Sequence, residues 1–211
     1  MPNYKNQEEA INHHKDYDVD TEAEGKYNCY DIYSEHKNRV KFLMNSIPED
    51  SHVLEIGCNS GGLLRLISEQ RKGYCVGLEI SEKLAEKAKA KGFNVTIGQA
   101  ENLPWEDNKF DVVVMTEVLE HIYQPGLALK EAHRVLKPGG VFVGSVPHPK
   151  GQNSKRGTTA KHRWHCHIFK EAELSELLKK YFCEIYTENI SHYNDQENTA
   201  QWMGWICKKE A

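Results

Sequence analysis

Short apolar runs alternate with amphipathic segments along most of the chain. The runs are HVLEIG (52–57), YCVGLEI (74–80), NVTIG (94–98), DVVVMT (111–116) and VFVGSV (141–146). Their length and their content of β-branched residues are typical of buried strands. Helical periodicity follows most of them, in LLRLISEQ, KLAEKAKAK and GLALKEAHRVL, and the last of these ends at Lys137-Pro138-Gly139, a helix stop. Strands that alternate with helices predict an α/β sheet that is mostly parallel.

The two ends of the chain follow a different pattern. Residues 1–26 are polar and predict a loosely held arm or short helices, whereas the apolar positions between Tyr30 and Ile47 favour a helix that ends at Pro48. Towards the carboxyl terminus, the helical segment EAELSELLKKY precedes two further strand candidates, CEIYTEN and QWMGWICKK. We therefore expect an N-terminal arm and helix over residues 1–48, able to form a lid over an acceptor site, and a single domain over residues 49–211.

Composition narrows the class of protein. A chain of 211 residues is long enough for a substantial core, and its net charge of -4 is that of an ordinary soluble protein. No apolar run is long enough to span a bilayer, and the first residues lack the apolar region of a signal peptide, so we expect no membrane insertion. The six cysteines are scattered without a C-x-x-C pair, which favours free thiols in a reducing, cytoplasmic environment.

The turn after the first predicted strand is the first candidate binding site. It reads GCNSGG (57–62) and opens a helix, so that its backbone N–H groups can meet a polar ligand group. Glu79 ends the next strand, where a carboxylate can accept both hydroxyls of a ribose; the alternative is that the glycines only form a tight turn. The turn departs from the G-x-G-x-x-G pattern of pyrophosphate sites, and Glu55 would repel a pyrophosphate but suits the cationic end of a methionine group.

Four segments together carry a resemblance to a known family. VLEIGCNSGGLLRLI, GLEIS, GQAENLPWEDNKFDVVVMTEVLEHI and EAHRVLKPGGVFVGSVP resemble the class I S-adenosylmethionine-dependent methyltransferases, from about His52 to Pro147. The resemblance implies a Rossmann-like seven-stranded sheet, mostly parallel with an antiparallel last strand and with helices on both faces, and it implies S-adenosyl-L-methionine as cofactor. The positions that it implies for the cofactor are Glu55, Gly57, Cys58, Asn59, Gly61, Glu79, Ile80, Gln99, Ala100, Glu101 and Thr116.

Two of these positions depart from the family pattern. Asn59 replaces the usual middle glycine, but Asn is the residue other than Gly that best tolerates left-handed backbone. Gln99 stands where an acidic residue is commoner, so that an amide oxygen would meet the adenine amino group.

TEVLEHI (116–122) is the first candidate for the chemistry at the acceptor. If the chain turns helical after the fourth strand, Glu117, Glu120 and His121 share one face, where they could ligate a divalent metal or supply a base. The alternative is that they have a structural role without metal. E-x-x-E-H followed by His167-Ile168-Phe169 also resembles the metal site of small-RNA 2′-O-methyltransferases.

That second resemblance implies both a ligand set and catalytic residues. Glu117, Glu120, His121 and His167 would hold Mg²⁺ or Mn²⁺, with His165 as the alternative to His167. The metal would acidify and orient an acceptor hydroxyl. Without metal, His121 or His167 would act as the general base, so that His121, His167 and Glu120 are the catalytic candidates.

The long segment 147–169 is the second candidate. It carries five Lys or Arg residues and four histidines, with no Asp or Glu. In a chain of negative net charge it predicts a local positive field, hence an acceptor that carries phosphate or carboxylate. The alternative is a surface loop that is basic without a ligand.

These observations predict an S-adenosylmethionine-dependent O-methyltransferase for a small, polar, anionic acceptor, such as a sugar derivative, a natural-product intermediate or a quinone precursor. An RNA 2′-O-methyltransferase is the second hypothesis, but an acidic chain with one basic loop disfavours nucleic acid. A nicotinamide-dependent dehydrogenase is opposed by the imperfect phosphate turn. The fourth hypothesis is a non-catalytic cofactor-binding partner subunit. The oligomeric state does not follow from the sequence.

Overall fold

The protein is built on one seven-stranded sheet. The computed structural model describes residues 4–16, 37–149, 165–191 and 200–211. Its strands are β1 (Val53–Ile56), β2 (Cys75–Glu79), β3 (Asn94–Ile97), β4 (Phe110–Thr116), β5 (Leu136–Pro147), β6 (Cys183–Ser191) and β7 (Ala200–Lys208). They lie in the order β3-β2-β1-β4-β5-β7-β6, and β7 runs antiparallel to both neighbours, whereas β1 to β5 pair in parallel. The predicted sheet, mostly parallel with an antiparallel last strand, is confirmed.

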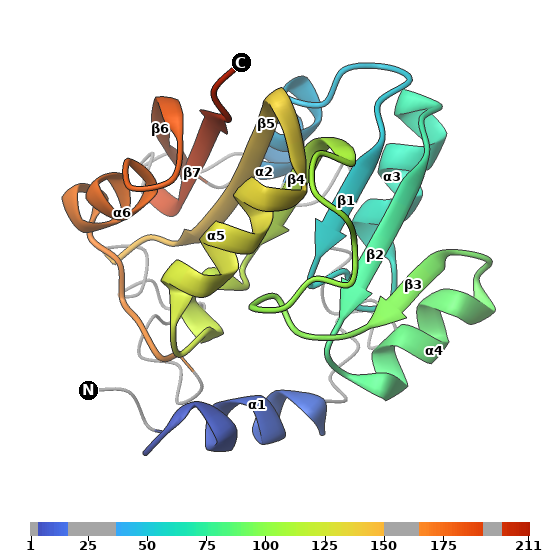
Figure 1. Ribbon diagram of the computed structural model, residues 1–211, viewed down its shortest axis with the longest axis horizontal. Helices are drawn as coiled ribbons and strands as arrows, with labels where there is room; N and C mark the ends of the chain where they lie inside the picture. Colours follow the sequence, from blue (N-terminus) through green and yellow to red (C-terminus); the bar gives the residue numbers. More distant parts are fainter. Residues whose placement is uncertain (1–3, 17–36, 150–164, 192–199) are drawn as a thin grey trace.

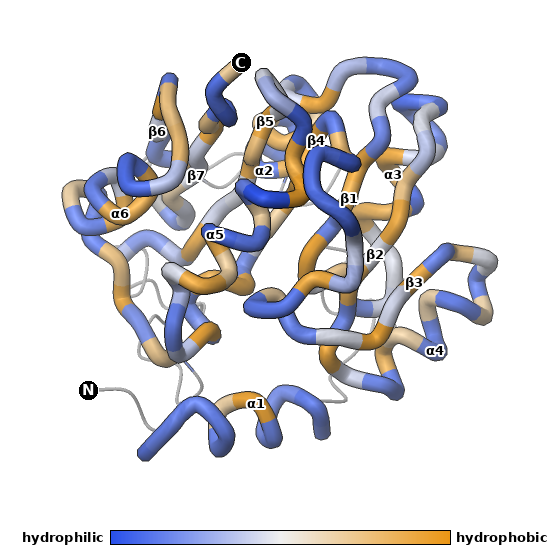
Figure 2. The backbone as a smooth tube through the Cα atoms, viewed as in Figure 1, coloured by the Kyte–Doolittle hydropathy of each residue, from blue (hydrophilic) through white to orange (hydrophobic). Residues whose placement is uncertain are grey.

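Helices cover both faces of the sheet (Figure 1). They are α1 (Gln7–Lys15), α2 (Lys37–Asn45), α3 (Gly62–Arg71), α4 (Glu82–Ala90), α5 (Pro125–Val135) and α6 (Glu171–Leu178), with one 3₁₀ turn, η1 (Leu119–His121). Alternate residues of a strand enter different cores: Val53 packs with α2 and α3, whereas Leu54 packs with α5 and α6. Because both faces are covered, the central strands are apolar at most positions on both faces, with Glu55 on β1 and Asp111 on β4 among the exceptions. Figure 2 shows this apolar interior along β1 and β4.

Most element boundaries agree with the sequence pattern, and two differ. β5 begins at Leu136, directly after α5, because Leu136 pairs with Phe110 before the register shifts, and Gly139 takes a left-handed φ of 73° inside the strand. The helix expected to end at Pro48 ends at Asn45 and continues as single turns to Ile47. Its expected first residues, 30–36, lie outside the described part of the chain.

The N-terminal helix α1 lies beyond the carboxyl ends of the strands (Figure 1). It is a short polar helix, as expected of residues 1–26, and Figure 2 shows it hydrophilic along most of its length. The side chain of Gln7 links it to two loops, donating to Glu101 Oε1 at 3.5 Å and accepting from Gln124 Nε2 at 2.6 Å. Tyr4 and Ala10 pack against Cys166.

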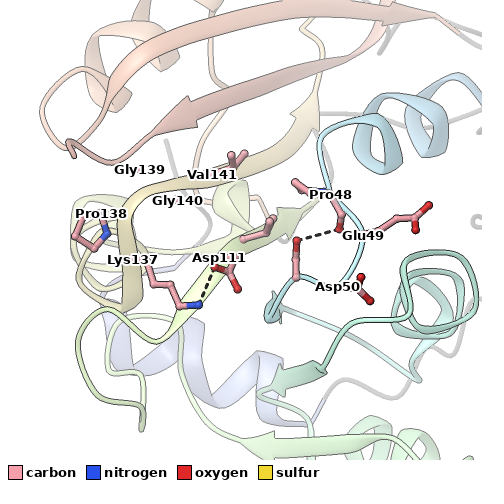
Figure 3. Close-up of a pocket in the computed structure, with 11 residues that line it drawn as sticks. Pro48, Glu49, Asp50, Asp111, Lys137, Pro138, Gly139, Gly140 and Val141 are labelled. Atoms are coloured by element: carbon pink, nitrogen blue, oxygen red, sulfur yellow. Dashed lines mark hydrogen bonds and ion pairs between the residues drawn. The ribbon is translucent and has the colours of Figure 1, made fainter.

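A shallow pocket lies at the amino ends of the strands, between the first residues of β4 and β5 and the loop before β1 (Figure 3). Its central charged groups are paired: Lys137 Nζ lies 2.7 Å from Asp111 Oδ1, and the backbone N–H of His52 donates to Asp111 Oδ2 at 2.9 Å. Parallel α/β sheets bind ligands at their carboxyl ends, so this amino-end pocket is not the candidate site.

Two further expectations can be compared with the structure. The cysteines within the described residues, Cys58, Cys75, Cys166, Cys183 and Cys207, are free thiols. None of the helices formed by those residues combines the length and apolar character needed to cross a membrane.

Candidate active site

The turn between β1 and α3 is built from left-handed backbone. Gly57, Asn59 and Gly61 have φ values of 76°, 50° and 89°. A Cβ on Gly57 would overlap the Cγ2 atom of Val118, so glycine is required there for both conformation and space. Asn59 adopts the left-handed conformation expected of it, and its Oδ1 accepts from the N–H of Ser60 at 2.6 Å. Cys58 contributes only backbone here, because its side chain is buried against α3 and α4.

Glu79 ties the end of β2 to this turn. Its Oε2 accepts from the N–H of Asn59 at 2.8 Å and its Oε1 from the N–H of Ser81 at 2.9 Å. Burial raises the pKa of Glu79, and these hydrogen bonds act against that rise. Glu55 on β1 is buried as well. Two carboxylates therefore lie under the glycine turn, at the edge where a ligand is expected.

The remaining predicted cofactor positions follow the same edge. Thr116 ends β4 and is buried, and Ile80 follows β2 directly. Gln99 forms a tight turn with Asn102 after β3, with Ala100 buried and Glu101 partly buried between them. Because β1 to β4 run in parallel, their carboxyl ends bring these residues to one side of the sheet.

The chain does not turn helical after β4, so the expected shared face of Glu117, Glu120 and His121 is wrong. Glu117 has a left-handed φ of 54°, and only the 3₁₀ turn η1 follows. The Oε1 atom of Glu117 accepts from Ser145 Oγ at 2.9 Å and lies 3.5 Å from Arg39 Nη1. Burial raises the pKa of Glu117, whereas Arg39 and Ser145 act in the opposite direction.

Glu120 is buried beside two imidazoles. Its side chain is 2% exposed, and neither carboxylate oxygen has a hydrogen-bond partner among the residues that the structure describes. His121 Nε2 lies 3.9 Å from Glu120 Oε1. Burial, and then the charge of Glu117, raise the pKa of Glu120 well above its ordinary value. The buried Glu120 and the partly exposed His121 thus form a pair that can accept a proton or a cation.

The third member of this group is His165. One ligand atom each from Glu120, His121 and His165 lies within 4.8 Å of the others, and the rings of His121 and His165 meet edge to face at 4.7 Å. His167 lies beside the backbone of the same region, with Nε2 3.3 Å from the carbonyl oxygen of Tyr123, and its ring stacks on Phe169. The structure therefore groups His165 with Glu120 and His121 and places Glu117 and His167 with other partners.

Backbone hydrogen bonds explain why His165 reaches this position. The N–H groups of Cys166 and His167 both donate to the carbonyl oxygen of Glu120, at 2.7 and 3.0 Å. The thiol of Cys166 donates to the carbonyl oxygen of His121 at 3.2 Å. These bonds join two segments that are far apart in the sequence, so local patterns contain no signal for them.

Sequence reasoning also missed residues from two helices. The ring of His14, on α1, lies 4.9 Å from that of His121, and Arg39, on α2, is buried under Glu117. Burial, together with His13 and His165, lowers the pKa of His14 to about 4, so its imidazole is neutral near pH 7. In the N-terminal arm, the adjacent pair His13-His14 was the one local feature of the sequence that could have indicated a role in the site. Most of the predicted basic segment, residues 150–164, lies outside the described residues.

Comparisons with known proteins agree with this geometry. Residues 54–144 match the model of a methyltransferase domain family. The chain is 35% identical over 120 residues to a demethylmenaquinone methyltransferase of Staphylococcus epidermidis (53% of this chain, 50% of that protein). It is also 35% identical over 129 residues to a probable S-adenosylmethionine-dependent methyltransferase of Mycolicibacterium smegmatis (60% of this chain, 49% of that protein). The chain thus spans about half the length of these relatives.

Solved structures share the fold. A chain from the complex between the Haloferax volcanii Trm112 methyltransferase activator and its methyltransferase superposes with a TM-score of 0.74 at 17% identity, covering 91% of this chain and 95% of that chain. At this identity the likeness concerns the fold, a seven-stranded sheet with one antiparallel strand and helices on both faces.

Proposed function

We propose that this chain, whose residues 54–144 match the methyltransferase domain family and whose sheet has the class I fold, is an S-adenosylmethionine-dependent methyltransferase. In this proposal it acts on a hydroxyl group of a small acceptor. The observation that carries the hydroxyl acceptor is the buried carboxylate of Glu120, without a hydrogen-bond partner among the described residues and beside the imidazole of His121.

The donor set under the glycine turn fits S-adenosylmethionine. When bound, the cofactor supplies an electrophilic methyl group on a sulfonium. Glu79 retains acceptor capacity beyond its two backbone hydrogen bonds and would receive the ribose hydroxyls. Glu55, buried on β1 before the turn, would hold the ammonium group. Two buried carboxylates suit this cationic ligand and oppose a pyrophosphate.

The pair Glu120–His121 performs the proton transfer in this proposal. An alcohol becomes a competent nucleophile only as its proton leaves, whereas an amine needs mainly placement. His121 Nε2 would take the hydroxyl proton, and the Glu120 carboxylate 3.9 Å away would stabilise the imidazolium.

The acceptor class rests on two supports of different kinds. The Staphylococcus epidermidis relative is a demethylmenaquinone methyltransferase, which favours a ring of quinone type among the acceptors that the sequence suggests. That relative methylates carbon, so transfer to a hydroxyl group rests on the Glu120–His121 pair alone. The anionic character of the acceptor rests on the basic segment 147–169 and stays a prediction, because most of that segment lies outside the described residues.

The test is a methyl-transfer assay with product analysis. The chain is incubated with isotopically labelled S-adenosylmethionine and a panel of quinols, phenols and sugar derivatives, with and without phosphate or carboxylate groups. We expect labelled methyl ethers, identified by mass spectrometry and proton NMR. Methyl groups found only on carbon or nitrogen would contradict hydroxyl methylation, and failure to bind S-adenosylhomocysteine would contradict the cofactor.

A metal-assisted form of the reaction is the second candidate, favoured by the three ligand atoms of Glu120, His121 and His165 within 4.8 Å. A divalent ion held there would supply Lewis acidity to the acceptor hydroxyl. Turnover that survives exhaustive chelation assigns proton removal to protein groups alone. Turnover that disappears and returns with added Mn²⁺ or Zn²⁺ assigns it to the ion.

Glu79→Ala weakens cofactor binding. The substitution removes a charged acceptor for two hydroxyls and releases the N–H of Asn59, so we expect the Kd of S-adenosylhomocysteine to rise roughly 10- to 100-fold. Isothermal titration calorimetry measures the change. Glu82→Ala, on the exposed first turn of α4, is the matched control and should leave the Kd unchanged. Equal affinities for the Glu79 variant and the wild type would remove the ribose role.

A further inference from the structure

The N-terminal helix brings a third imidazole, that of His14, to the group of Glu120, His121 and His165. The His14 ring lies 4.9 Å from the His121 ring, which in turn lies 4.7 Å from the His165 ring. The Nε2 atom of His14 is buried and has no hydrogen-bond partner in the described part of the chain. Three segments distant in the sequence therefore converge: α1, the turn after β4 and the stretch before α6.

The buried carboxylate of Glu120 points to a cation as the ligand of this group. A carboxylate that is 2% exposed and lacks hydrogen bonds is unfavourable unless a cation or a proton compensates it. Arg39, the buried arginine nearby, lies against Glu117 at 3.5 Å and over the Trp202 ring. In its neutral form an imidazole offers a lone pair on one ring nitrogen, so the histidines next to the carboxylate are suitable metal ligands.

The ligand types select the class of metal. Three imidazoles and one carboxylate favour Zn²⁺, Co²⁺ or Ni²⁺ over Mg²⁺ and Ca²⁺, which prefer oxygen ligands. In a tetrahedral site with ligand bonds of about 2.0 Å, the ligand atoms lie about 3.3 Å apart. The present separations of up to 4.8 Å then close by rotation of the side chains.

We infer that Glu120, His121 and His165 bind a divalent transition metal ion and that His14 completes the site as fourth ligand, so that the bound ion fixes α1 across the carboxyl edge of the sheet. Four protein ligands leave no open position on the ion. The acceptor hydroxyl and His14 therefore compete for one position on the ion, and metal binding with α1 in place excludes the acceptor from it.

Because α1 is held by few contacts, a metal bond to His14 would contribute strongly to its attachment; we call this metal-dependent attachment of α1 the latch. Ala10 is its buried residue, and a helix of nine residues has little stability of its own. The contacts that hold α1 and the segment before it on the rest of the protein include the Gln7 hydrogen bonds to Glu101 and from Gln124 and the packing of Tyr4 on Cys166. A metal bond to His14 would add a constraint comparable to all of these together. The inference rests on the proposed function in one respect, since exclusion of an acceptor matters only if the protein methylates one.

Metal binding by the full chain tests the site without any substrate. The chelator-stripped protein is titrated with Co²⁺, and its visible absorption reports four-coordination. Zn²⁺ affinity follows from competition with a chromogenic chelator. We expect one ion per chain, a Zn²⁺ affinity roughly 100-fold weaker in His165→Ala and His14→Ala, and a loss of the four-coordinate spectrum in both. His133→Ala, on α5 and paired with Glu210, is the matched control and should bind as the wild type does.

Hydrogen exchange tests the latch. We expect Zn²⁺ to slow exchange of the amides of residues 7–15 in the wild type and in His133→Ala, but not in His14→Ala. Absence of stoichiometric binding by the wild type, or unchanged binding by His165→Ala, would overturn the metal site. Equal slowing in His14→Ala would overturn the role of α1. Methyl transfer is measured separately in chelator, so failure of the proposed function and failure of the metal site are distinguishable.

Discussion

Glu120→Gln is expected to lower the rate of methyl transfer by roughly 10²- to 10⁴-fold while leaving cofactor affinity unchanged. The amide has nearly the shape of the carboxyl group, so packing around the buried side chain is retained. It cannot carry the negative charge that stabilises a protonated His121, and it is a poor metal ligand. Both the direct and the metal-assisted form of the reaction therefore depend on the carboxylate, whose Oε1 lies 3.9 Å from His121 Nε2.

The measurement is single-turnover methyl transfer together with calorimetry of S-adenosylhomocysteine. Glu106→Gln is the matched control, because its side chain is exposed and pairs with Lys109 on the surface. A Glu120 variant that turns over at the wild-type rate would show that proton removal does not use this carboxylate. A variant that loses cofactor affinity in parallel would show that the carboxylate supports the binding site rather than the chemistry.

Gly144→Ala is expected to destabilise the fold by about 3 kcal/mol or more. Gly144 lies in β5, which pairs with β4 on one side and β7 on the other. A Cβ atom on Gly144 would overlap the carbonyl oxygen of Met115 and the indole ring of Trp205. The oxygen belongs to a neighbouring strand and cannot rotate away, so the β4–β5 pairing would have to separate. Glu117 follows β4 directly, and its N–H bonds to Ser145 on β5, so the site would be disturbed with the sheet.

Urea denaturation measures this loss, and Gly139→Ala provides the comparison within the same strand. A Cβ on Gly139 would meet nothing within 4 Å, so its penalty is the left-handed φ of 73°, which costs about 1–2 kcal/mol. We expect the Gly144 variant to be clearly the less stable of the two. Equal denaturation midpoints would show that the sheet can widen at Gly144.

The buried charges at the carboxyl edge explain which ligands the site suits. Among the described residues, the buried charged side chains are Arg39, Glu55, Glu79 and Glu120, three acids and one base. Burying carboxylates is unfavourable without compensation, so this edge favours ligands that bring positive charge or hydroxyl donors. A sulfonium cofactor and a divalent ion both meet that requirement. A dinucleotide, with its pyrophosphate, does not.

Much of the fold followed from the sequence because its determinants are local. The strand runs are mostly apolar since both faces of the sheet are covered, and this pattern is visible without any structure. The glycine turn was recognisable because Gly57 and Gly61 occupy conformations that other residues avoid. The position of Glu79 could be predicted for a related reason. When two neighbouring strands run in parallel, the carboxyl end of the second lies beside the turn that follows the first.

The sequence by itself determined the α/β sheet, the turn after β1 and the acidic end of β2. Only the tertiary structure decided which side chains meet at the acceptor end. A single left-handed residue, Glu117, interrupted the expected helical face, and the backbone bonds from Cys166 and His167 to Glu120 selected His165 in place of His167. The position of His14 depends on how α1 docks across the strand ends. Contacts of this kind join residues far apart in the chain, and periodicity, which records only which face of an element is buried, does not contain them.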